Sequence, residues 1–87
     1  MELKQEILDL LTAEKEEIRE IRLTYKNGGQ VAGTIRKLRV KNGAKPSVKL
    51  VIEKLDPQSG ERPRHKAVFD HLTELVIILK DGSEHAF

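Results

Sequence analysis

The sequence is poor in the residues that build covalent or redox sites. It has no cysteine and no tryptophan, and Tyr25, Phe69 and Phe87 are its only Phe, Trp or Tyr side chains. Without thiols, a disulfide framework and a thiolate metal site are both excluded. It also has no long apolar run, and its charged, amphipathic start (MELKQEIL) matches neither a signal peptide nor a membrane span. We therefore expect one soluble, cytoplasmic domain over residues 1–87, large enough for one modest core.

Charge is distributed unevenly along the chain, although the net charge is only +2. Residues 1–20 carry three basic and seven acidic side chains, a net charge of −4. The remaining residues carry 13 basic and 7 acidic side chains, a net charge of +6, and twelve of these basic residues lie between Arg22 and Lys66. An acidic segment joined to a basic body indicates that the body binds a polyanion.

The acidic segment has the periodicity of a helix. Its apolar residues recur at helical spacing with charges between them, and they are Leu3, Ile7, Leu8, Leu10 and Leu11, with Ile18 extending the pattern. This predicts an amphipathic helix over residues 1–17. A lone helix of this length is marginal in water, so its apolar stripe has to be buried. We expect it to cover one end of the rest of the domain; binding of a partner protein is the alternative.

From Ile21 onwards, apolar residues recur at every second position, which predicts β-strands. We expect them over 21–26, 30–40, 48–53, 62–69 and 75–79, with a short sixth strand over 83–87. Asn27-Gly28 predicts a hairpin turn, and residues 56–60 have the composition of another turn. Two features predict a bent second strand with a bulge near Arg36-Lys37. Gly33 has no side chain, and the apolar residues that should face inward change from one side of the strand to the other between Ile35 and Leu38.

Short turns and the absence of a crossover helix favour an all-β arrangement over a parallel α/β sheet. The prediction is a mainly β domain: a small, bent, five-stranded SH3-like barrel over residues 21–87, preceded by the N-terminal α-helix over residues 1–17.

One stretch resembles the first motif of the Sm-like family, which includes the bacterial Hfq-type proteins. It is Leu23-Thr24-Tyr25-Lys26-Asn27-Gly28 followed by Val31, Gly33 and Ile35, and Arg64-His65-Lys66-Ala67-Val68 resembles the second motif loosely. The resemblance implies a bent barrel, RNA binding, and a homo-oligomeric ring in which the fourth strand of one subunit pairs with the fifth of the next.

The sequence also departs from that family. Residues 36–41 read RKLRVK, so the Asp-x-x-x-Asn element of the uridine pocket is absent and no particular base pocket is implied. A second resemblance is to YolD-like and WYL-type small barrels, which are accessory or regulatory modules.

Basic residues gather at the predicted bend, in the loop after it, and on the fourth strand. The candidate nucleic-acid-binding residues are Arg36, Lys37, Arg39, Lys41, Asn42, Arg64, His65 and Lys66. In a barrel closed as in the Sm-like family, these two regions approach each other and their cations follow a phosphate backbone. A solvated basic surface that opposes aggregation is the alternative. The few aromatic residues argue against base stacking as the main mechanism.

The last long strand is apolar on both faces and predicts assembly. The candidate oligomer-interface residues are Val68, Leu75, Val76, Ile77, Ile78 and Leu79. An internal strand buried on both sides within one chain is the alternative.

We expect no catalytic residues, no cofactor, no metal and no small-molecule substrate. His65, His71 and His85 lack the spacing of metal ligands, and no pattern holds two carboxylates in an apolar cleft. The leading hypothesis is a homo-oligomeric Sm-like protein that binds single-stranded RNA. The competing hypothesis is a protein-interaction or regulatory module that uses the helix or strand 75–79.

Overall fold

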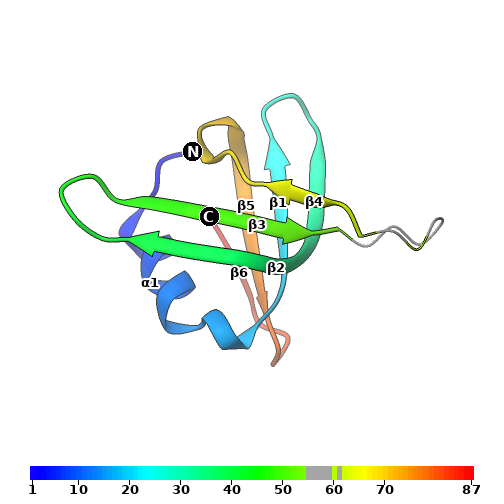
Figure 1. Cartoon of the computed structure of the whole chain (residues 1–87), viewed down its shortest axis with the longest axis horizontal. Coiled ribbons are helices and arrows are strands. Elements are labelled where there is room, and N and C mark those ends of the chain that lie inside the picture. Colours follow the sequence, from blue (N-terminus) through cyan, green and yellow to red (C-terminus); the bar gives the residue numbers. More distant parts are fainter. Residues whose placement is uncertain (55–59, 61) are drawn as a thin grey trace.

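The computed structural model describes residues 1–54, 60 and 62–87, and shows a mainly β chain with one N-terminal α-helix (Figure 1). The elements are α1 (Gln5–Ala13), the short 3₁₀ helix η1 (Lys15–Glu17), β1 (Ile18–Tyr25), β2 (Gln30–Lys41), β3 (Ser47–Glu53), β4 (Arg64–Lys66), the 3₁₀ helix η2 (Phe69–His71), β5 (Leu72–Leu79) and β6 (Glu84–Ala86). The turn expected over 56–60 falls, except for Gly60, outside the described residues.

The N-terminal helix is shorter than the predicted range of 1–17. It ends at Ala13, and Glu14 leaves helical geometry with φ −111° and ψ 16°. The next residues are charged and offer no apolar side chain to bury, so packing does not reward a longer helix. The β-branched Ile18 begins β1 and pairs with Leu79, so the β segment starts three residues before Ile21.

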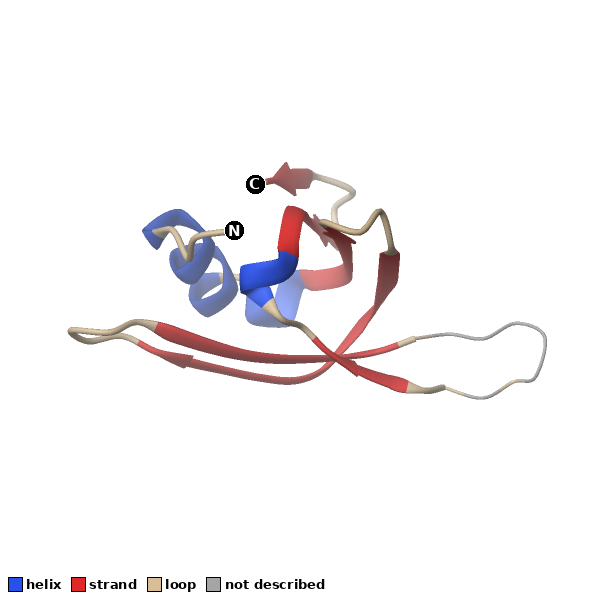
Figure 2. Ribbon diagram, turned by 90° about the horizontal axis from the view of Figure 1, so that it is seen from above, coloured by secondary structure: helices blue, strands red, loops and turns tan. Residues whose placement is uncertain are grey.

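The six strands form one antiparallel sheet in the order β4-β3-β2-β1-β5-β6. β4 and β6 are therefore its two edges, and the sheet is open. The closed, five-stranded barrel is not confirmed. In Figure 2 the β2–β3–β4 part and the part that contains β6 lie on opposite sides of the molecule. The sheet bends along the long strand β2, whose first half pairs with β1 and whose second half pairs with β3.

Two features of β2 that the sequence predicts explain this bend. The register between β2 and β3 shifts between Ile35 and Lys37, which confirms a bulge at Arg36. The end of β3 crosses so close to Gly33 that an added Cβ would overlap the carbonyl oxygen of Glu53 and lie 2.9 Å from its carbonyl carbon. Only glycine fits where two backbones approach this closely.

The Asn27-Gly28 turn is also confirmed. Gly28 has φ 88°, and the amide of Tyr25 donates to the carbonyl of Gly29 at 2.8 Å. Positive φ at this position is accessible to glycine without steric cost.

The core lies between the two halves of the bent sheet and extends to the helix. Its buried members are Ile7, Leu11, Ile21, Leu23, Leu38, Leu50, Ile52, Ala67, Phe69, Leu72, Leu75, Ile77 and Leu79. Val31, Ile35 and Val40 pack against this cluster. The residues of β2 that face the core therefore have odd numbers before the bulge and even numbers after it, as predicted. No helix in the described part of the chain is long and apolar enough to cross a membrane.

Candidate nucleic-acid interface

Basic side chains from three neighbouring strands share the outward face of β2, β3 and β4. Arg39 is the register partner of Lys49, and Val51 has Lys37 on one side and Lys66 on the other. Lys41 lies two residues beyond Arg39 on the same face of β2, because side chains alternate along a strand. We call Lys37, Arg39, Lys41, Lys49 and Lys66 the basic face.

Four of the five side chains of the basic face line an open depression of about 410 Å³, whose lining residues are Arg39, Lys41, Ser47, Val48, Lys49 and Lys66. The cations there are close enough to repel one another. Arg39, and next Lys49, lower the pKa of Lys37 below its usual value of 10.5, because each positive charge disfavours another. The depression is therefore a place of positive potential.

No carboxylate neutralises the basic face within the described residues. The single ion pair of that part joins Arg22 Nε to Glu20 Oε2 at 2.7 Å, on β1. All five side chains of the basic face are exposed. Their charges are therefore available to a ligand from solution.

The structure brings together four of the eight predicted binding residues: Lys37, Arg39, Lys41 and Lys66. Arg36 occupies the bulge, and Asn42 lies in the loop after β2; both are exposed. Arg64 is the register partner of Glu53, so a carboxylate lies beside it at the margin of the basic face.

Lys49 belongs to the basic face but was missing from the predicted residues. The alternation of Val48, Leu50 and Ile52 places Lys49 on the outward side of β3. The missing information was the register, which sets Lys49 opposite Arg39.

His65 lies apart from the other predicted residues. Its Nε2 is 2.6 Å from the hydroxyl of Tyr25 on β1, and the two rings meet edge to face. Burial, and to a smaller extent the charge of Lys54, lower the pKa of His65 below 6.5. This side chain is turned away from the basic face and shares the side of β4 that leads to the buried Ala67 and Phe69.

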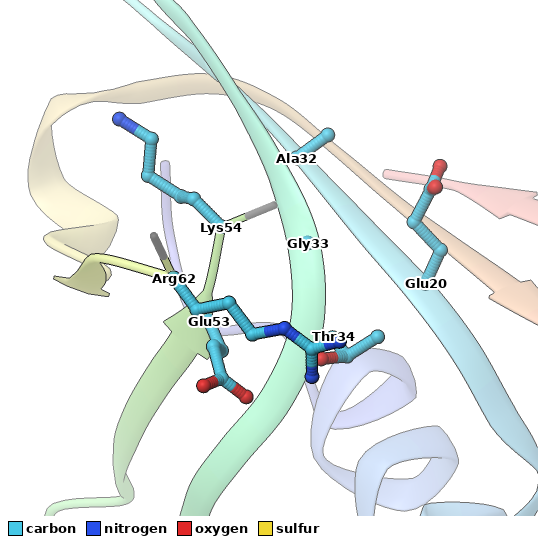
Figure 3. Close-up of a pocket in the computed structure, with 7 residues that line it drawn as sticks. All are labelled: Glu20, Ala32, Gly33, Thr34, Glu53, Lys54 and Arg62. Carbon is cyan, nitrogen blue, oxygen red and sulfur yellow. The ribbon is translucent and has the colours of Figure 1, made fainter. Parts of the chain in front are cut away.

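A second depression, of about 380 Å³, opens where β3 crosses β2 (Figure 3). It is lined by Glu20, Ala32, Gly33, Thr34, Glu53, Lys54 and Arg62. Glu53 lies two residues beyond Val51 on β3, so this pocket adjoins the basic face. Its charges are mixed, because two carboxylates and two cations line it.

The candidate oligomer-interface residues lie mostly inside this chain. β5 is an inner strand, paired with β1 on one side and β6 on the other. Leu75, Ile77, Ile78 and Leu79 are buried, and Val76 is partly buried. Val68 is 44% exposed and is the one large apolar side chain that is exposed in the described part of the chain. An interface at these six residues stays a prediction.

Comparisons of this chain with protein-family models, with curated proteins and with solved structures gave no match. The functional inference therefore depends on the residues and their geometry.

Proposed function

We propose that this protein binds single-stranded RNA through the phosphate groups of the RNA, which lie along the basic face. The observation that carries the proposal is that four cations from three strands line one depression, with Lys37 on the same face and no carboxylate paired to any of the five among the described residues.

Phosphate is the ligand chemistry that suits this surface. The repulsion that lowers the pKa of Lys37 is relieved when a polyanion binds among Lys37, Arg39 and Lys49. Binding also releases the counterions condensed on the nucleic acid, which favours association at low salt. Contacts of this kind position a backbone without reading its sequence, so we expect similar affinity for different RNA sequences.

The spacing of the basic side chains along β2 sets the path of the RNA backbone. Lys37, Arg39 and Lys41 project from alternate positions, about 6–7 Å apart along the strand. Lys49 and Lys66 extend the face sideways onto β3 and β4. Beyond Val51 the RNA backbone cannot continue along this face, because the carboxylate of Glu53 repels phosphate. The bound phosphates therefore lie between the β2–β3 loop and Glu53.

The resemblance of residues 21–79 to the Sm-like family supports the same proposal, because members of that family bind RNA as homo-oligomers.

The competing hypothesis is a protein-interaction module that binds its partner through the apolar stripe of the helix or through strand 75–79. Ile7, Leu8 and Leu11 of α1 are buried against this chain, as are four of the five residues of that strand segment. The five side chains of the basic face, in contrast, are all exposed to solvent.

Fluorescence anisotropy with a labelled single-stranded RNA tests the proposal. The face variant carries Lys37→Ala, Arg39→Ala, Lys49→Ala and Lys66→Ala. The matched control carries Lys4→Ala, Lys15→Ala, Lys26→Ala and Lys80→Ala, which remove the same charge from positions elsewhere on the chain. We expect the face variant to bind roughly tenfold more weakly or worse at low salt, with a much smaller loss in the control. Equal losses in both variants would show that only net charge matters and would contradict the proposal.

A further inference from the structure

The depression on the basic face lies where β2 and β3 meet their shared loop. Lys41 is the last residue of β2, Ser47 is the first residue of β3, and the two are register partners. The chain between them, residues 42–46, is an exposed loop at one end of the molecule (Figure 1). An RNA backbone that follows β2 from Lys37 towards this loop therefore reaches the depression last.

The basic face has room for only a few phosphate groups. Two steps of about 6–7 Å along β2 separate Lys37 from Lys41. Glu53 lies beyond Val51, on the side of the face that is away from the loop. Binding to such a short surface depends on few phosphates, so the charge of each one matters.

The depression holds more positive charge than an internal phosphate of RNA requires. Four cations from three strands line it, and residues 36–52 contain no aspartate or glutamate. An internal phosphate is a diester with one negative charge. A terminal phosphate is a monoester that carries about −1.5 to −2 charges at pH 7 and offers three strong acceptor oxygens. The monoester therefore matches the depression better than the diester does.

Ser47 adds a hydroxyl to the four cations that line the depression. A hydroxyl donates a hydrogen bond to a phosphate oxygen without adding charge. Arg39 and Lys49 are register partners and supply a guanidinium and an ammonium group beside it. The depression thus presents three kinds of donor, which suits a ligand with three acceptor oxygens.

We propose that this depression binds the terminal phosphate of a single-stranded RNA. The adjacent internal phosphates then follow β2 past Lys37. The inference rests on the proposed RNA binding and adds that the protein recognises an RNA end. Recognition of an end needs no contact with a base, so it fits binding that is independent of sequence.

A competition assay with four unlabelled RNAs of one sequence tests the proposal. The first carries a 5′-phosphate, the second a 3′-phosphate, the third hydroxyls at both ends, and the fourth is a circle, which has internal phosphates alone. Each competes at low salt with an internally labelled strand for the unmodified protein. We expect at least one phosphorylated RNA to bind roughly tenfold more tightly than the hydroxyl-ended and circular RNAs. The stronger of the two phosphorylated RNAs identifies which end is bound.

Two matched variants show whether the depression causes this preference. The depression variant carries Lys41→Ala and Ser47→Ala. The control carries Lys37→Ala and Thr34→Ala, which also remove one cation and one hydroxyl from exposed positions of the sheet, outside the depression. The depression variant should prefer the phosphorylated RNA by less than about threefold. The control should bind every RNA more weakly and keep the full preference.

Equal affinity of the unmodified protein for all four RNAs would overturn this inference and leave the proposed RNA binding standing. A preference that persists in the depression variant, or that falls equally in the control, would also overturn it, because the end would then be bound elsewhere. If none of the four RNAs bound at low salt, the proposed function would fail, and this inference with it.

Discussion

The hydroxyl oxygen of Tyr25 on β1 lies 2.6 Å from Nε2 of His65 on β4. These strands are not neighbours in the sheet, because β2 and β3 lie between them in the strand order. The same hydroxyl oxygen accepts a hydrogen bond of 3.3 Å from the amide of Val68. The oxygen has a second lone pair, so the tautomer of His65 sets which of the two groups donates in their contact. One polar contact thus joins the two halves of the bent sheet.

Replacing Tyr25 with phenylalanine should remove this link and keep the ring. We expect Tyr25→Phe to lower the free energy of unfolding by about 1 kcal/mol, because His65 and the amide of Val68 lose a partner. Urea denaturation measures the change. Thr73→Val is the comparison, since it removes an exposed hydrogen bond of 3.3 Å to the carbonyl of Thr24. An equal loss in both variants would contradict a special role for the Tyr25–His65 contact.

Stability should depend on pH through His65. Its pKa in the folded protein is lowered from 6.5, first by burial and then by Lys54. The unfolded chain therefore binds a proton at a higher pH than the folded chain does, and stability falls as pH drops below about 6.5 until the lowered folded pKa is passed. Urea denaturation between pH 8 and pH 5 should show this fall. It should shrink in His65→Gln and persist in His71→Gln; the reverse pattern would refute the assignment.

Gly33 should tolerate no side chain. Gly33→Ala should destabilise the fold by about 2 kcal/mol or more, because the new Cβ overlaps backbone atoms of Glu53 that cannot move aside cheaply. Gly43→Ala is the matched substitution, since a Cβ there has no atom within 4 Å and needs no positive φ. It should be neutral or stabilising by up to about 1 kcal/mol. Thermal denaturation distinguishes the two, and similar melting temperatures would show that the crossing of β3 over β2 is wrong.

Helix α1 should contribute to the stability of the whole domain. Leu11 is fully buried in the same cluster as the strand residues, so Leu11→Ala should cost about 2–5 kcal/mol. The neighbouring Thr12 is exposed, and Thr12→Ala should change stability by less than about 0.5 kcal/mol. If Leu11→Ala unfolded at the same urea concentration as the unmodified protein, the helix would have to be an independent arm.

Local features of the fold could be predicted from the sequence because each has a local physical cause. Alternation placed Ile21, Leu23, Leu50 and Ile52 in the core, and the phase change in β2 indicated the bulge. Barrel closure could not be judged in this way. It depends on whether the edge strands meet, and the pairing of β6 with β5 leaves β4 and β6 as separate edges.

The candidate site shows the same limit. Lys37, Arg39 and Lys41 alternate along one strand, so their common face could be read from spacing alone. Lys49 could not be assigned without the β2–β3 register. His65 shows the opposite case: its alternation with Arg64 and Lys66 already placed it on the other side of β4, and its grouping with the basic residues ignored that pattern.

The salt dependence of RNA binding tests the central claim most directly. For a single strand, the slope of log K against log salt should become shallower by about 0.7 for every phosphate that the protein no longer neutralises. Removing Lys37, Arg39, Lys49 and Lys66 together should therefore flatten the slope by roughly two to three units, whereas the matched control at Lys4, Lys15, Lys26 and Lys80 should keep a slope near that of the unmodified protein. An unchanged slope in the face variant, or no RNA binding by the unmodified protein at low salt, would contradict the proposal that the basic face holds the RNA backbone.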